Sequence, residues 1–249
     1  MRREKAAPTT LRFVSYNIHK GIGGVDRLCR LDRTIETLRG VGADVCLLQE
    51  VDEGAARSRF ERQVDVLGDA LGLPHRAYAP NHRLALGHYG NAILSRVPFR
   101  STHNLSLTLP LHKKRAALHA RFAVPGVRHG LWVFNCHLGL AEAERRQQLR
   151  RILRFIDQHH GSQETLVLMG DLNDMWLKLG PAVLEPAGFR SVERPPRTFP
   201  AIRPLRPLDR VFVRGRVRIV RCDRVDGPVA RQASDHLPIS VDLLISPSR

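Results

Sequence analysis

An acid and an amide directly follow one apolar stretch of this sequence. Residues 165–169 (TLVLM) have the composition of a buried strand, and Gly170 separates them from Asp171 and Asn173. An unpaired buried charge is costly, so a carboxylate at the end of a buried strand is paired, metal-bound or neutralised. Asp171 and Asn173 are therefore candidates for a site that handles charge.

Three further strand-like segments end on polar side chains that can do chemistry. Residues 13–16 run into Asn17 and His19, residues 44–48 into Gln49 and Glu50, and residues 131–134 into Asn135 and His137. Polar groups at neighbouring strand ends of a layered α/β fold converge on one rim, where binding sites form. The repeated pattern predicts one site built from carboxylates, amides and imidazoles.

The charge balance points to an anionic partner. Lys and Arg number 40 against 24 Asp and Glu, which gives a formal net charge of +16. Such a charge attracts nucleic acid, anionic lipid surfaces or phosphorylated small molecules. A genome that favours arginine codons would produce the same excess of Lys and Arg without any anionic partner. Net charge in any case bears on binding partners and not on the fold.

Cysteine spacing and hydropathy narrow the class of protein. The four cysteines form no C-x-x-C pair, which argues against a zinc ribbon or a thioredoxin-like motif. The charged N-terminus leads into no apolar segment, and no run approaches the roughly eighteen apolar residues of a membrane span. We expect a soluble, cytoplasmic protein with a flexible basic tail (residues 1–10) and a single domain (residues 11–249).

Hydrophobic periodicity predicts more strands than helices. Helical spacing indicates helices near residues 31–38, 64–71 and 141–160. The expected strands are residues 11–18, 44–50, 91–94, 116–124, 130–137, 165–169, 208–213, 216–220 and 239–245. Because the helices fall between groups of strands, this order indicates two packed sheets with helices outside.

Seven short segments together resemble one known superfamily. They are YNIH (16–19), LQEV (48–51), GNAILSR (90–96), NCHL (135–138), GDLN (170–173), LDRVF (208–212) and SDHLP (234–238). Each is weak alone, but in this order and spacing they resemble the endonuclease/exonuclease/phosphatase superfamily. That group includes DNase I-like nucleases, AP endonucleases, neutral sphingomyelinases, deadenylases and inositol polyphosphate 5-phosphatases. The resemblance extends from residue 11 to about residue 245.

The resemblance implies a fold and a reaction. The fold is a four-layer α-β-β-α sandwich, in which two mostly antiparallel mixed sheets pack face to face inside outer helices. The reaction is hydrolysis of a phosphoester with a divalent ion, usually Mg²⁺, for which Mn²⁺ is a possible substitute. By position, the implied metal ligands are Glu50, Asn17 and Asp235. The implied catalytic or phosphate-contacting residues are Asp171, Asn173, His236, Asp209 and His137. Weaker matches for substrate binding are Arg115, Asn91 and His19.

The residue types suit this chemistry independently of the resemblance. Mg²⁺ prefers oxygen ligands and keeps several waters, so one or two carboxylates with an amide are sufficient. A phosphodiester repels hydroxide, so its hydrolysis needs charge neutralisation and an aligned water. Either Asp171 or His236 could be the general base, and we assign Asp171. Structural alternatives remain for Asp235 as a turn or cap residue and for Asp209 as a partner of Arg210 or Arg214. His137 could likewise be a core histidine, and Asn91 could be structural.

The substrate is the least determined feature. AP endonucleases tend to have Trp-Asn and Gln-Glu-Thr-Lys where this chain has Tyr16-Asn17 and QEVD at residues 49–52, which resembles the phosphodiesterase, sphingomyelinase and deadenylase side. We therefore expect a bacterial-type, Mg²⁺-dependent phosphodiesterase that acts on a phospholipid or a small phosphodiester. The alternatives are an endo- or exonuclease acting on DNA or RNA and a non-catalytic polyanion-binding module. A basic face could also contact an anionic membrane peripherally.

Overall fold

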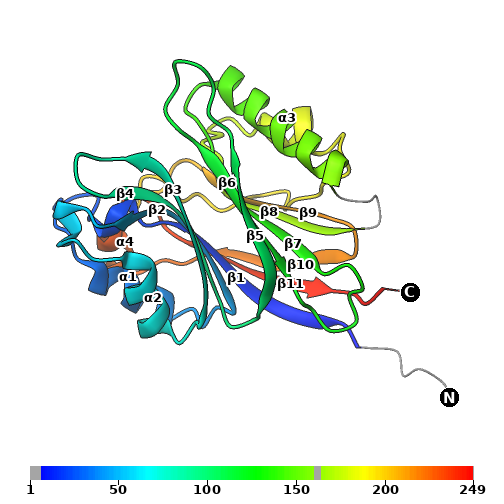
Figure 1. Cartoon of the computed structure of the whole chain (residues 1–249), viewed down its shortest axis with the longest axis horizontal. Helices are drawn as coiled ribbons and strands as arrows, with labels where there is room; N and C mark the ends of the chain where they lie inside the picture. The colour runs from blue at the N-terminus through cyan, green and yellow to red at the C-terminus, as the bar shows by residue number, and fades with distance from the viewer. Residues whose placement is uncertain (1–6, 160–163, 249) are drawn as a thin grey trace.

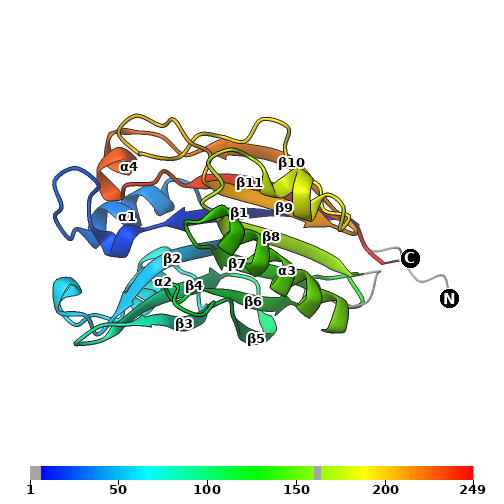
Figure 2. The same ribbon diagram turned by 90° about the horizontal axis from the view of Figure 1, so that it is seen from above.

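Two β-sheets pack face to face in the computed structural model, which describes residues 7–159 and 164–248 (Figure 1). Helices cover the outer face of each sheet, so the predicted four-layer α-β-β-α sandwich is confirmed. Both described chain ends lie at one end of the sandwich, where Thr9 pairs with Ile245 (Figure 2). The strand ends that carry the predicted site lie at the other end.

The first sheet has six strands and one parallel pair. In spatial order they are β10 (Val217–Arg224), β11 (Ile239–Ile245), β1 (Thr9–Asn17), β2 (Val45–Glu53), β4 (His88–Ser95) and β3 (His75–Arg83). Strands β1 and β2 are parallel, and every other neighbouring pair in this sheet is antiparallel. The carboxyl ends of β1 and β2 therefore lie side by side.

The second sheet repeats this plan with five strands. Their order is β5 (Phe99–Ser106), β6 (Ala116–Phe122), β7 (Leu131–His137), β8 (Thr165–Asp171) and β9 (Asp209–Arg214). Here β7 and β8 form the parallel pair. Each sheet thus presents the carboxyl ends of two parallel strands at the same end of the sandwich.

Alternating side chains build three apolar layers. In β1, Phe13 faces the core between the sheets, whereas Val14 faces the helices α1 (Leu31–Arg39) and α2 (Gln63–Leu71). In β7, Val133 faces the central core, and Phe134 packs under α3 (Glu142–His159). The remaining helices are α4 (Pro228–Ala233) and three short ones, η1 (His19–Gly21), η2 (Ala56–Ser58) and η3 (Gly180–Leu184).

A buried amide joins the two sheets near their site end. Asn135 in β7 donates from Nδ2 to the carbonyls of Leu48 and Ala92, each at 2.9 Å, and accepts at Oδ1 from Gln49 Nε2 at 2.7 Å. Leu48 and Ala92 form the last regular pair of β2 and β4 before their register shifts. Gln49 and Asn135 are therefore inter-sheet tethers rather than members of a catalytic cluster.

Asn135→Leu is expected to destabilise the fold by about 2 to 4 kcal/mol, because it removes three buried hydrogen bonds, two to the carbonyls of Leu48 and Ala92 and one from Gln49 Nε2. Chemical denaturation measures this free energy of unfolding. Asn104→Leu, at an exposed position of β5, is the matched control and should change stability little. A loss at Asn135 no larger than the loss at Asn104 would contradict the tether.

Two strands and part of the tail depart from the sequence prediction. Strands β3 and β5 were not predicted, because they are edge strands that bury little and therefore lack apolar alternation. The predicted tail (1–10) is too long, since β1 already begins at Thr9; residues 1–6 lie outside the described residues. No helix within the described ranges has the length and apolarity to cross a membrane.

Candidate functional site

The carboxylate of Asp171 lies at the centre of a buried polar cluster drawn from both sheets. Its Oδ2 accepts a hydrogen bond from Asn17 Nδ2 at 3.0 Å. The same oxygen lies 3.6 Å from His137 Nε2 and 3.7 Å from His236 Nε2. Its Oδ1 accepts from the backbone N–H of Asn173 at 3.0 Å. Four predicted site residues thus surround one carboxylate.

Strand register brings these residues together. His137 is paired with Asp171 across β7 and β8, and Asp171 is paired with Asp209 across β8 and β9. Gly170 permits the close approach of β7, since a Cβ at this position would lie 2.0 Å from the carbonyl oxygen of Cys136. The glycine that precedes the acid is therefore needed by the packing of the two strands.

The His236 imidazole is held between two carboxylates. Its Nδ1 lies 2.9 Å from Asp209 Oδ2, and that oxygen also accepts a hydrogen bond from Thr198 Oγ1 at 2.6 Å. Ser234 Oγ donates to the Asn17 carbonyl at 2.7 Å and accepts from the His236 N–H at 3.2 Å. The segment before β11 is thereby tied to the end of β1.

Burial and charge set the protonation of this pair. Burial raises the pKa of Asp171, and the nearby Asp209 charge raises it further, although His236 and Asn17 act in the opposite direction. Burial alone would lower the pKa of His236, but the charges of Asp209 and Asp171 raise it well above its ordinary value. The imidazole is therefore stabilised as a cation that faces Asp171.

Glu50 is turned out of the β-ladder by a bulge. The register of β2 against β4 shifts between Leu48 and Val51, and Glu50 has a left-handed φ of 56°. A non-glycine residue in this region is strained, and such strain concentrates at functional sites. The bulge presents the carboxylate, which forms an ion pair with the Lys20 ammonium.

Positive charge keeps Glu50 ionised despite its burial. Burial opposes ionisation, yet His137, Lys20 and His19 lower the pKa of Glu50 to about 2. Burial and the Arg115 charge lower the pKa of His137 well below its ordinary value. Because the lowered pKa keeps the His137 imidazole neutral, the cation that pairs with Glu50 is the Lys20 ammonium.

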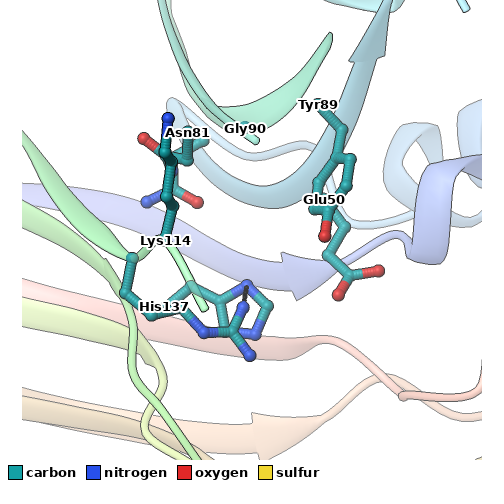
Figure 3. A pocket seen from close by; sticks show the side chains of 8 residues that line it. Glu50, Asn81, Tyr89, Gly90, Lys114 and His137 are labelled. Atoms are coloured by element: carbon teal, nitrogen blue, oxygen red, sulfur yellow. Dashed lines mark hydrogen bonds between the residues drawn. The ribbon is translucent and has the colours of Figure 1, made fainter. Parts of the chain in front are cut away.

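One pocket connects Glu50 with the second sheet (Figure 3). Its lining includes Glu50, Tyr89, Asn91, Lys114, Arg115 and His137. Arg115 Nη1 lies 3.2 Å from His137 Nδ1, whereas Arg115 Nε is buried without a hydrogen-bond partner among the described residues. Asn91 donates to the Ala116 carbonyl at 3.1 Å, and its buried Oδ1 is likewise unpaired. Both weaker candidates thus line this pocket and carry a buried polar atom without a hydrogen-bond partner.

Asp235, His19 and Asn173 lie at the edges of the cluster. His19 Nδ1 is 3.8 Å from Asp235 Oδ1 and 3.0 Å from the Ile22 carbonyl. Asn173 donates from Nδ2 to the Leu138 carbonyl at 2.9 Å, which leaves its Oδ1 available. His19 and Asn173 also have left-handed φ values, 46° and 51°. Every predicted site residue therefore lies at this one end of the sandwich.

The donor set fits a hard divalent ion such as Mg²⁺. Glu50 supplies an ionised carboxylate that already faces a cation, and Asp235 supplies a second carboxyl group. Among the described residues, Asn17 Oδ1 accepts only the His19 N–H, at 3.1 Å. The described residues contain no group of three or more His, Cys, Asp or Glu side chains arranged around a metal position. A small set of oxygen ligands suits Mg²⁺, which keeps several of its waters.

Three contributors were not predicted from the sequence. Lys20 contacts Glu50, Thr198 hydrogen-bonds Asp209, and Tyr89 lines the pocket with the Lys20 ammonium 5.3 Å from its ring centre. Lys20 directly follows His19 in the first motif, so its position was a usable signal. Thr198 lies in a Pro-rich loop with no periodic pattern to place it.

Comparison with known proteins agrees with the fold and identifies the family. The family model for the endonuclease/exonuclease/phosphatase family matches residues 14–236. The uncharacterized protein YbhP of Escherichia coli (strain K12) is 30% identical over 256 residues, covering 94% of this chain and 96% of YbhP. An endonuclease/exonuclease/phosphatase from Beutenbergia cavernae has a TM-score of 0.76 at 23% identity, covering 95% of this chain and 72% of that one. The mannosyl-6-phosphatase Bt3783 of Bacteroides thetaiotaomicron has a TM-score of 0.70 at 18% identity, covering 94% and 99%. The chain belongs to the endonuclease/exonuclease/phosphatase family.

Proposed function

We propose that this protein is a Mg²⁺-dependent hydrolase of phosphoester bonds, acting on the phosphodiester of a phospholipid or of a small molecule. The observation that supports it best is the position of Asp171. Its Oδ2 faces Asn17, His137 and His236 at 3.0, 3.6 and 3.7 Å. One carboxylate oxygen surrounded by an amide and two imidazoles suits a water and a phosphate that must be held side by side.

Each side chain has a role that follows from its contacts. Asp171 accepts a proton from the attacking water, and the Asn17 amide keeps the accepting oxygen oriented. His236 has Nδ1 directed at Asp209 and Nε2 directed at Asp171, so two anions favour its protonated form. A protonated imidazole cannot accept a proton, which is why Asp171 rather than His236 is assigned as the base.

The pocket beside Glu50 supplies the charge that a phosphate needs. Arg115, held by His137, and Lys114 bring positive charge to the rim of the pocket. Glu50, Asn17 and Asp235 would hold Mg²⁺. The bound ion would neutralise the phosphate and stabilise the leaving oxygen. Lys20 balances the Glu50 charge when no metal is bound.

A nuclease activity is the second candidate, and the net charge of +16 is the observation that favours it. A phosphomonoester is a further possibility within the family, because the structural relative Bt3783 is described as a mannosyl-6-phosphatase. Activity assays must therefore distinguish the phosphoester class as well as the metal requirement.

Hydrolysis of bis(4-nitrophenyl) phosphate tests the reaction class. We expect turnover to disappear in EDTA and to return with Mg²⁺ or Mn²⁺. Glu50→Gln should lower kcat/KM by about a hundredfold or more, because it removes the main charge that holds the ion. Turnover that is unchanged in EDTA would contradict the metal assignment.

A substrate panel follows in the same buffer. It contains 4-nitrophenyl phosphate, supercoiled plasmid, single-stranded RNA and phospholipid vesicles. Preferential cleavage of phospholipid over nucleic acid supports the first candidate. Preferential cleavage of plasmid or RNA, with no lipid hydrolysis, would replace it with the second.

A further inference from the structure

Exposed apolar side chains gather on the loops around the site. Eleven large apolar side chains are exposed in the described part of the chain, and ten of them lie on loops at the end of the sandwich that carries Asp171. The exception is Val220 on β10. Scattered exposed apolar residues need no explanation, but a concentration at the catalytic end marks an interaction surface.

Four of these loops surround the second sheet and form what we call the apolar rim. Its members are Leu111, Leu140, Met175, Trp176, Ile202 and Leu205. They lie in the loops that precede β6, follow β7, follow β8 and precede β9. Because Ala116, His137, Asp171 and Asp209 are register neighbours, these four loops leave the sheet at the same edge.

Contacts between the loops make the rim continuous. His112 Nδ1 lies 3.3 Å from Glu144 Oε2, which joins the loop of Leu111 to the start of α3. Lys178 Nζ lies 3.4 Å from Glu142 Oε2, which joins α3 to the loop of Trp176.

The Arg206 guanidinium lies 4.5 Å from the centre of the Trp176 ring. This contact joins the loop of Trp176 to the loop of Leu205. The Phe199 ring in this last loop is centred 5.0 Å from His236. The rim therefore extends up to the catalytic imidazole.

Two of the ten exposed apolar residues at this end, Leu111 of the rim and Phe60 of the loop after β2, also have a strained backbone. Leu111 is fully exposed with a left-handed φ of 64°, and Phe60 is 63% exposed with a φ of 60°. Glycine or asparagine adopts this conformation at lower cost. A large apolar side chain at such a position adds strain and no packing within the fold, so its use lies outside the chain.

The charge beside the rim identifies the partner. Lys113, Lys114 and Arg203 are exposed, and none forms an ion pair with another described residue. The Lys113 ammonium lies 5.6 Å from the centre of the Tyr89 ring. Apolar side chains flanked by cations that form no ion pair complement a bilayer whose headgroups are anionic. A second copy of this chain is disfavoured, because each copy carries +16.

The kind of apolar side chain argues against single-stranded nucleic acid. Bases stack on aromatic rings, whereas eight of the ten exposed side chains at this end are aliphatic. The two aromatic ones are Phe60 and Trp176, and Arg206 already covers the Trp176 ring. Aliphatic side chains instead suit the boundary between headgroups and acyl chains.

We propose that the apolar rim docks this protein on an anionic phospholipid bilayer, with Lys113, Lys114 and Arg203 on the lipid phosphates. Docking in this orientation presents a headgroup phosphodiester to Asp171. In that respect the inference rests on the proposed function, whereas the docking itself needs no catalysis.

Vesicle co-sedimentation tests the docking. The wild type should bind phosphatidylcholine vesicles that contain phosphatidylglycerol and bind pure phosphatidylcholine weakly. The triple variant Leu111→Ser, Leu140→Ser, Leu205→Ser should bind the anionic vesicles at least about tenfold more weakly. Val220→Ser, at the exposed apolar position away from the site, is the matched control and should bind like the wild type. Equal binding by the triple variant and the wild type would overturn the proposal.

Two further measurements keep the outcomes separate. Turnover of soluble bis(4-nitrophenyl) phosphate by the triple variant should equal that of the wild type, because none of the three substituted leucines lines the pocket beside Glu50. If the wild type hydrolyses the soluble substrate but does not bind vesicles, the docking proposal is overturned and the proposed function stands. If it binds vesicles but does not hydrolyse the substrate, the proposed function is overturned and the docking proposal stands. If the wild type forms a dimer that the triple variant does not form, the rim is a dimer interface and the proposal is overturned. The proposal is also overturned if the protein binds oligonucleotides and only Trp176→Ala abolishes that binding.

Discussion

Asp171→Asn is expected to lower kcat for phosphodiester hydrolysis by about a hundredfold to ten-thousandfold, the usual contribution of a general base. The substitution keeps the shape of the side chain but removes the charge that, in the proposed mechanism, accepts a proton from water. Asp171 is 1% exposed and its pKa is raised by burial, so neutralising it should leave the fold intact. Steady-state kinetics with bis(4-nitrophenyl) phosphate measures the loss, and thermal unfolding checks the fold.

Asp174→Asn is the matched control for this variant. Asp174 is equally buried and lies three residues along the chain, but it accepts hydrogen bonds from the backbone N–H groups of Lys178 and Leu179 at 3.1 and 2.8 Å. Its loss should lower the unfolding temperature and leave kcat nearly unchanged. A folded Asp171→Asn variant with wild-type kcat would remove Asp171 from the mechanism.

His236→Ala is expected to lower kcat about a hundredfold or more, because in the proposed mechanism the reaction loses a cation placed 3.7 Å from the Asp171 carboxylate. Asp209→Asn should lower kcat less, since it leaves the imidazole in place but weakens the contact that keeps it charged. The order of the two losses checks whether Asp209 acts through His236.

His119→Ala serves as the control for removing a buried imidazole. The His119 ring is 4% exposed and packs 4.9 Å from the ring of Phe134, beneath α3 rather than at the site. This variant should lose stability and keep its kcat. If His119→Ala and His236→Ala lowered kcat alike, general destabilisation would explain both.

The strand-end pattern in the sequence predicted much of this arrangement. Asn17, His137 and Asp171 end three buried strands, and buried strands are the elements that apolar runs reveal most clearly. Parallel pairing then places their ends at one edge of each sheet. The order of predicted helices and strands indicated two packed sheets, and the superfamily resemblance implied that the site lies at one end of them.

The remaining features depend on information that is not local. The bulge at Glu50 arises from the register of β2 against β4, which no short motif encodes. Gln49 and Asn135 follow the same strand-end pattern as the site residues, yet they hydrogen-bond to each other between the sheets. Sequence spacing could not separate a tether from a catalytic amide, because both are polar groups at the end of a buried strand.

A double-mutant cycle of Asp171→Asn and His236→Ala tests most directly whether these residues form one catalytic unit. Groups that act as a unit show losses that do not add. We expect the double variant to have a kcat close to that of the slower single variant. Losses that multiply in full would show that Asp171 and His236 act independently, which would contradict the single site proposed for this end of the sandwich.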